Sequence, residues 1–227
     1  LLTASGTAGL EIRLEAPAEV AVTILPQGAS SRETIEYPPA LAPSAGDGEW
    51  ILPLGEGVRV PVTDVDRPGL LGGHTWSQRS LIMPWFGLTA GEGAGLLVLV
   101  ESPDDFQLGL REAGAAGAGD LRVLCAANQW LPQGPGIGYP RRLRYCLFDR
   151  GGHVAMARRY RRYLQETGRF RTLAAKAGQL PQVSRLLGAV DILDVSPGGD
   201  EVVDWMIESG IERALYTVHW HAKPLAG

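Results

Sequence analysis

The chain has 227 residues, of which 45% are hydrophobic and 20% charged, a composition that argues against intrinsic disorder. It contains no run of about 18 consecutive apolar residues, so we expect no membrane-spanning segment. A net charge of −4 argues against a nucleic-acid-binding chain. The two cysteines, Cys125 and Cys146, are too few for a disulfide framework. They could form a single bridge, and we favour the interpretation as two buried thiols.

Residues 1–150 predict an antiparallel β-sandwich. Short apolar runs are separated by most of the glycines and prolines, and several of them alternate apolar and polar residues. Many short strands with turn residues between them, and no helices, are typical of this architecture. We expect strands at 10–14, 19–24, 50–53, 58–62, 81–85, 96–101, 121–126 and 142–148.

Residues 151–183 predict a helical connector. A helix is expected at 152–167, because apolar residues recur there at helical spacing and Gly168 follows as a stop. A second, short helix is expected at 172–177 with Thr172 as its N-cap, and Pro181 ends that segment.

Residues 184–227 predict one strand–helix–strand unit. The apolar run 186–195 is typical of a strand buried on both faces, the segment 200–209 of a helix capped by Asp200, and 211–220 of a second, parallel strand. One such unit cannot close a sheet, so we expect it to leave apolar surface exposed and to be the start of a TIM-type α/β barrel. Because the sequence lacks an initiator Met and stops just after an apolar run, we expect the natural protein to be longer.

The ends of the two predicted parallel strands carry the candidate substrate-binding residues. Active sites of α/β barrels gather at the carboxyl ends of the strands. Asp194 lies near the end of the first strand, and His219 and Trp220 lie at the end of the second. Asp191 lies in the middle of its strand, where a carboxylate would be costly if it were buried without a partner.

His219 and His221 form an HxH pair, whose side chains would point the same way on a strand and could bind zinc or another divalent metal. The chain has only four histidines, so such a site would need ligands from elsewhere. The alternative is a pair of polar side chains that face a sugar. The aromatic side chains leave a similar choice between stacking on sugar rings and filling the core; they are Trp76, Trp85, Phe86, Trp130, Trp205 and Trp220.

Residues 141–171 hold ten arginines against Asp149 and Glu166, a local charge of +8. Four of these arginines, at 158, 159, 161 and 162, are spread around the predicted helix and form no single stripe. This spacing disfavours nucleic acid. Arginine also suits interdomain ion pairs with the acidic remainder of the chain, which we expect here.

Several short segments occur in an informative order between residues 37 and 220. They are Leu52-Pro53-Leu54-Gly55-Glu56-Gly57, Met83-Pro84-Trp85-Phe86-Gly87, Glu101-Ser102-Pro103-Asp104-Asp105, Tyr160-Arg161, Gly168, Thr172-Leu173-Ala174-Ala175-Lys176, Pro181-Gln182-Val183 and Leu187-Gly188-Ala189. In this order the chain resembles the glycoside hydrolases related to α-N-acetylgalactosaminidases (families 101 and 129). It departs from them after the second parallel strand, where Lys223-Pro224-Leu225 stands in place of a Gly-rich aromatic loop.

The resemblance implies a galactose-mutarotase-like sandwich packed on a catalytic barrel, and hydrolysis of an α-glycosidic bond by two carboxylates, one nucleophile and one general acid/base. No residue here matches those carboxylates, so we expect the catalytic residues downstream of Gly227 and no activity of this chain alone. We therefore interpret the chain as the N-terminal part of a glycosidase acting on a carbohydrate such as an N-acetylgalactosaminide or galactoside. We expect no cofactor and no nucleic-acid or membrane partner. The alternatives are a non-catalytic carbohydrate-binding or degenerate fragment, and a metal-dependent hydrolase using His219 and His221.

Overall fold

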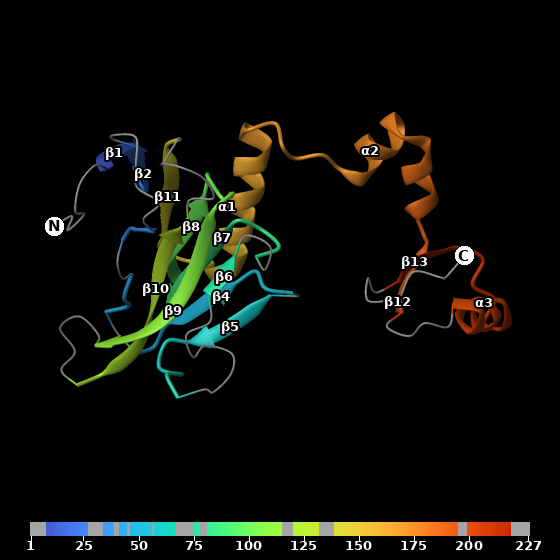
Figure 1. The fold of residues 1–227 in the computed structure, drawn as a ribbon, viewed down its shortest axis with the longest axis horizontal. Helices are drawn as coiled ribbons and strands as arrows, with labels where there is room; N and C mark the ends of the chain where they lie inside the picture. Colours follow the sequence, from blue (N-terminus) through green and yellow to red (C-terminus); the bar gives the residue numbers. More distant parts are fainter. Residues whose placement is uncertain are drawn as a thin grey trace. The chain divides into compact units, whose positions relative to one another are not determined.

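A computed structural model describes the chain in two compact units, Leu1–Tyr163 and Leu164–Gly227 (Figure 1). The residues that it describes are 8–26, 34–38, 41–44, 46–55, 57–66, 75–77, 81–114, 120–131, 139–194 and 199–218. The predicted domain boundaries at 150 and 183 stay predictions.

Two antiparallel sheets form the first unit, which confirms the predicted β-sandwich architecture. The larger sheet has the order β1-β2-β11-β8-β7-β4-β5 and the smaller one β3-β10-β9-β6. The strands are β1 Ala8–Ala16, β2 Glu19–Pro26, β3 Ile35–Glu36, β4 Glu49–Leu52, β5 Val58–Pro61, β6 Thr75–Ser77, β7 Trp85–Ala90, β8 Ala94–Val100, β9 Phe106–Gly114, β10 Arg122–Trp130 and β11 Arg141–Phe148.

The core lies between the two sheets and is built from inward-facing residues of both. Trp50, Phe86 and Trp130 are fully buried in it, and the Trp50 indole nitrogen donates a hydrogen bond to the Leu124 carbonyl on the opposite sheet at 2.9 Å. A buried indole donor is costly without a partner, so this bond fixes how the two sheets face each other.

The strand predicted at 81–85 is wrong. Residues 82–84 form a bend, and β7 starts only at Trp85, immediately after Pro84, which has no amide proton to donate to a ladder. Strands β3, β6 and β9 were not predicted from the sequence. Residues 91–93 form the turn that joins β7 to β8.

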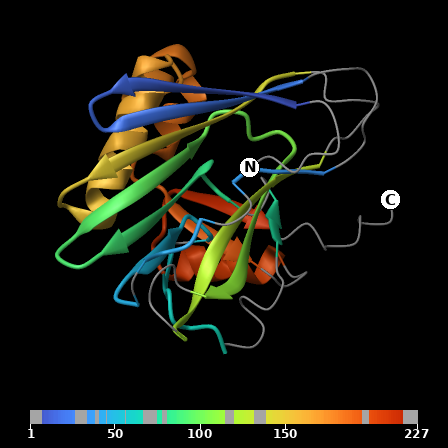
Figure 2. The same cartoon turned by 90° about the vertical axis from the view of Figure 1, so that its left-hand side faces the viewer.

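Helix α1 (Gly152–Glu166) lies on the outer face of the larger sheet (Figures 1 and 2). Met156 of this helix is fully buried over Gly87 and Gly95, where any Cβ atom would overlap it. The two glycines therefore let the helix approach the sheet backbone. Its first amide, that of Gly152, donates to the Gly93 carbonyl in the β7–β8 turn at 2.8 Å, which holds the start of the helix on the sheet.

The second unit contains α2 (Leu173–Gln179), a 3₁₀ helix at Pro181–Leu186, β12 (Val190–Asp194), α3 (Gly199–Glu208) and β13 (Ala214–Val218). Thr172 caps α2 as predicted, with its hydroxyl oxygen accepting from the Ala175 amide at 3.1 Å. Strands β12 and β13 pair in parallel, which confirms the strand–helix–strand unit. A complete barrel stays a prediction. None of the described helices combines the length and apolarity needed to cross a bilayer.

This second unit leaves apolar surface open, as expected. On the strands, Val190 and Leu215 are 47% and 44% exposed. On α3, exposure reaches 71% at Ile207. Such exposed apolar surface is unusual for a closed core.

Candidate functional site

The carboxyl ends of β12 and β13 form the candidate site, here called the carboxyl edge. Asp194 is the last residue of β12 and pairs in register with Val218, the last residue of β13. The parallel pairing follows from the helical crossover through α3, because parallel neighbours need a connection of this length. The backbone therefore brings Asp194 beside the residue that directly precedes His219.

Three of the predicted residues at this edge, His219, Trp220 and His221, lie outside the described residues. Within the part of the chain that the structure describes, no three His, Cys, Asp or Glu side chains are grouped as metal ligands. The metal hypothesis therefore stays a prediction.

Two acidic residues, Asp200 and Glu201, lie in the first turn of α3, which follows β12 at the same edge. Carboxylates there are stabilised by the positive end of the helix dipole, so they have a structural role without any ligand. Asp191, in the middle of β12, is exposed and avoids the desolvation cost that burial would bring.

The Glu101–Asp105 segment, which carries part of the sequence resemblance, is structural. Glu101 pairs with Arg142 and Arg144 at 2.7 Å each. Asp105 accepts from Arg141 Nη2 and from the Tyr139 hydroxyl, both at 2.5 Å. This segment therefore joins the end of β8 to the start of β11 and offers no free carboxylate for catalysis.

The Asp105–Arg141–Tyr139 cluster is the most buried charged group among the described residues. The side chains of Arg141 and Asp105 are 1% and 5% exposed. The guanidinium also lies 4.3 Å from the centre of the Tyr139 ring. Burial, together with the hydrogen bond to Asp105, raises the pKa of Tyr139 to about 12, so this phenol stays a proton donor to the carboxylate.

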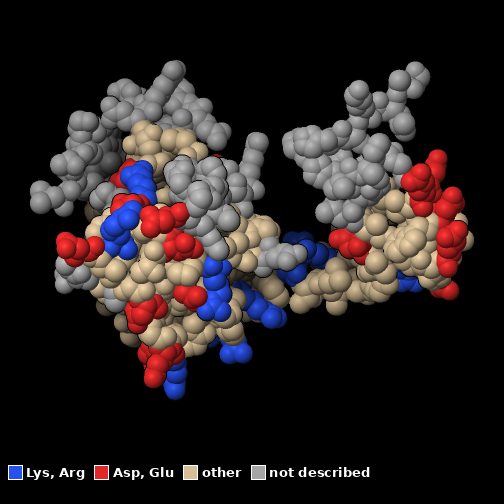
Figure 3. Space-filling view, turned by 90° about the horizontal axis from the view of Figure 1, so that it is seen from below, with Lys and Arg blue, Asp and Glu red and all other residues tan. Residues whose placement is uncertain are grey.

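Ion pairs within the first unit neutralise much of the arginine-rich region, while the interdomain pairs that were expected stay a prediction. Arg144 pairs with Glu15, Glu19 and Glu101, and Glu19 pairs also with Arg159 of α1. The hydrogen bond from Arg159 is the main cause that lowers the pKa of Glu19. Figure 3 shows acidic and basic side chains interspersed over this unit.

The aromatic side chains that could stack on sugar rings divide into buried and exposed ones. Phe86 and Trp130 are fully buried in the sandwich core, and Trp85 is buried against Tyr160 of α1, with ring centres 6.2 Å apart. These three cannot stack on a sugar. Trp205 on α3 is 51% exposed, while Trp220 lies outside the described residues.

Both cysteines are free and buried, as predicted. Burial raises the pKa of the Cys146 thiol to about 12, which removes it as a nucleophile at neutral pH.

No protein-family model and no curated protein sequence matches the chain. Solved structures of the α-N-acetylgalactosaminidase NagBb from Bifidobacterium bifidum do match. Its GalNAc complex is 21% identical with a TM-score of 0.72, over 93% of this chain and 38% of that one. Its Gal-NHAc-DNJ complex is 21% identical with a TM-score of 0.72, over 94% and 39%. The ligand-free form is 21% identical with a TM-score of 0.69, over 93% and 39%.

At this identity the likeness is one of fold, and the chain spans less than two fifths of the enzyme that it matches. The resemblance to an α-N-acetylgalactosaminidase that the sequence indicated is thus confirmed in the fold.

Proposed function

We propose that this chain is part of a glycoside hydrolase that cleaves an α-glycosidic bond, with an N-acetylgalactosaminide or galactoside as substrate. One observation carries the proposal: the structural match to an α-N-acetylgalactosaminidase extends over 93% of the chain. Because the second unit holds residues 164–227, a match of that extent takes in residues of both units and not the sandwich alone.

The open apolar surface of the second unit supports this proposal. Val203, Trp205 and Ile207 of α3 are each at least half exposed, and Leu215 of β13 is 44% exposed. Further strand–helix units of a barrel would bury these side chains, since each strand of a barrel has neighbours on both sides and each helix has neighbours around the ring.

In the proposed enzyme, the carboxyl edge contributes to the sugar subsite. Asp194 would accept hydrogen bonds from sugar hydroxyl groups, His219 would exchange hydrogen bonds with them, and Trp220 would stack on the apolar face of the ring. The two catalytic carboxylates would come from later strands, beyond this chain. One would attack the anomeric carbon of the sugar or activate a water molecule, and the other would protonate the leaving oxygen.

The test is to express the protein encoded by the source gene, including whatever follows codon 227, and to follow release of p-nitrophenol from the α-N-acetylgalactosaminide and the α-galactoside. We expect turnover by the longer protein and none by the 227-residue chain. A longer protein that binds these sugars without turnover would instead favour the carbohydrate-binding alternative. Activity that is lost with EDTA and restored by zinc would favour the metal-dependent alternative.

Substitution at the carboxyl edge tests the assignment of Asp194. In the longer protein, Asp194→Asn is expected to raise KM about tenfold, because one charge-assisted hydrogen bond to the sugar is weakened. The matched control is Asp204→Asn, an exposed carboxylate within α3, which should leave kcat and KM unchanged. Equal kinetics for the two variants would remove Asp194 from the subsite.

A further inference from the structure

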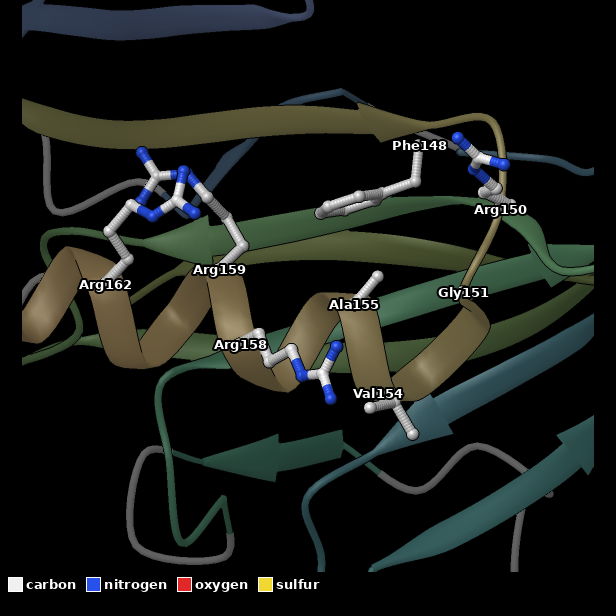
Figure 4. A pocket seen from close by; sticks show the side chains of 8 residues that line it. All are labelled: Phe148, Arg150, Gly151, Val154, Ala155, Arg158, Arg159 and Arg162. Atoms are coloured by element: carbon white, nitrogen blue, oxygen red, sulfur yellow. The ribbon is translucent and has the colours of Figure 1, made fainter.

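A hollow of about 560 Å³ lies in the first unit between α1 and the end of β11. It is called the arginine hollow here. Its lining includes Phe148, Arg150, Ala155, Arg158, Arg159 and Arg162. In Figure 4 the Phe148 ring lies between Arg150 at one end and Arg159 and Arg162 at the other, with Ala155 below it and Arg158 running along the helix.

The arginines of the hollow differ in whether a carboxylate neutralises them. Arg159 is held by Glu19 through two hydrogen bonds, the longer at 2.8 Å. Arg150, Arg158 and Arg162 are exposed, and none of them has a hydrogen-bond or ion-pair partner among the described residues. Three guanidinium groups therefore face one hollow with their charge uncompensated.

This arrangement costs the helix stability. Arg158 and Arg162 are four residues apart on one face of α1, where like charges repel and where a glutamate would be the stabilising neighbour. Elsewhere in the same unit the arginines are matched with carboxylates, as at Arg142 and Arg144. A bound anion would supply the missing negative charge.

The chemistry of the lining identifies the ligand class. Guanidinium groups bind carboxylate, sulfate and phosphate oxygens through paired N–H donors. The partly exposed Phe148 ring adds an apolar surface of the kind that packs against a sugar ring. The volume lies within the range of pockets that hold small molecules.

We propose that the arginine hollow binds an acidic sugar, meaning a monosaccharide unit that carries a sulfate ester or a carboxylate. The oxyanion part rests on the three uncompensated arginines. The sugar part rests on Phe148 and on the proposed function, under which carbohydrate is the material that this protein meets. Binding here would give the protein a preference for acidic glycans.

Calorimetric titration of the 227-residue chain tests the proposal with inorganic sulfate, N-acetylgalactosamine 6-sulfate, N-acetylneuraminic acid and neutral N-acetylgalactosamine as probes. We expect an acidic sugar to bind more tightly than sulfate, and the neutral sugar to bind at least about tenfold more weakly than its sulfate ester. The better of the two acidic sugars identifies whether the anion is a sulfate ester or a carboxylate.

Arg158→Gln with Arg162→Gln should weaken binding of the acidic sugar and of sulfate by about tenfold or more. The matched control is Arg169→Gln with Arg171→Gln, which removes the same charge from two exposed arginines that do not line the hollow. Phe148→Leu should weaken binding of the acidic sugar and leave binding of inorganic sulfate unchanged. All four arginines are exposed, so both double variants are expected to fold, which their unfolding midpoints will verify.

Equal weakening in the control pair would overturn the proposal, because the effect would then be diffuse charge. Tighter binding of a single-stranded oligonucleotide than of either acidic sugar, lost in Arg158→Gln/Arg162→Gln, would also overturn it in favour of nucleic acid. Failure of the proposed function is a separate result: it shows as absent turnover in the longer protein and leaves sulfate binding by this chain untouched.

Discussion

Replacement of Arg141 by methionine tests the buried Asp105–Arg141–Tyr139 cluster. Methionine fills much of the volume of the arginine stem but leaves the Asp105 carboxylate, 5% exposed, with the Tyr139 hydroxyl and without its cation. Removal of one partner from a buried ion pair costs about 3–5 kcal/mol. For a chain of this size each kcal/mol lowers the unfolding midpoint by roughly 2–4 °C, so we expect a fall of about 6–20 °C.

Thermal and urea unfolding of the 227-residue chain measure this effect. The matched control is Arg13→Met, because Arg13 pairs with Glu11 while its side chain is 68% exposed, and that change should leave the midpoint in place. The double variant Arg141→Met/Asp105→Leu should recover most of the loss, since no buried charge then remains. A loss below about 1 kcal/mol for Arg141→Met would refute the reasoning, because it would place the pair among ordinary surface ion pairs.

Three further outcomes are expected. Gly95→Ala should destabilise the chain by about 1–3 kcal/mol in urea unfolding, because its Cβ would lie 2.7 Å from both the Leu88 carbonyl oxygen and the Met156 methyl group. Gly114→Ala, with nothing within 4 Å, should not, and equal effects would contradict the close packing around Gly95. Cys146 should resist a thiol reagent at pH 8 until urea unfolds the chain, since its pKa is raised to about 12, and rapid labelling of the native chain would contradict this. The pKa of Glu19 is lowered in the folded state, so its contribution to the free energy of unfolding is present above about pH 4.5 and is lost as pH falls through the folded pKa. Glu19→Gln should therefore flatten the acid side of the curve of stability against pH. An unchanged slope on that acid side would count against the Arg159 contact.

Local signals in the sequence were sufficient for much of the fold. The N-cap at Thr172 and the helix stop at Gly168, whose φ is +68°, depend on residues within one turn and were read correctly. Strand β9 also carried a local signal, the alternation of Phe106, Leu108 and Leu110, which was overlooked. The bend before Trp85 was predicted wrongly as a strand. The apolar run there contains Pro84, which cannot donate a hydrogen bond to the neighbouring strand.

Long-range pairings could not be read in this way. Asp105 and Arg141 are 36 residues apart in the sequence, with Asp105 in the turn before β9 and Arg141 at the start of β11, so their contact depends on how the sandwich closes. In the arginine hollow, the spacing of Arg158 and Arg162 was visible in the sequence, but Phe148 joins them only because the chain reverses at Gly151, whose φ is +96°. The parallel pairing of β12 and β13 sets the backbone register that places Asp194, the predicted sugar-binding residue, beside Val218.

The topology of the larger sheet also sets the order in which the protein can fold. Strand β2 pairs with β11, so that Ile24 meets Arg141 across 117 residues, and β11 in turn pairs with β8 in the middle of the sheet. During synthesis the β1–β2 hairpin must therefore wait, with one edge unpaired, until residue 148 has left the ribosome. Closure of so long a loop is slow, and the waiting edge is exposed to pairing with other chains. By contrast β12, α3 and β13 lie within 29 consecutive residues, and their pairing needs only local chain.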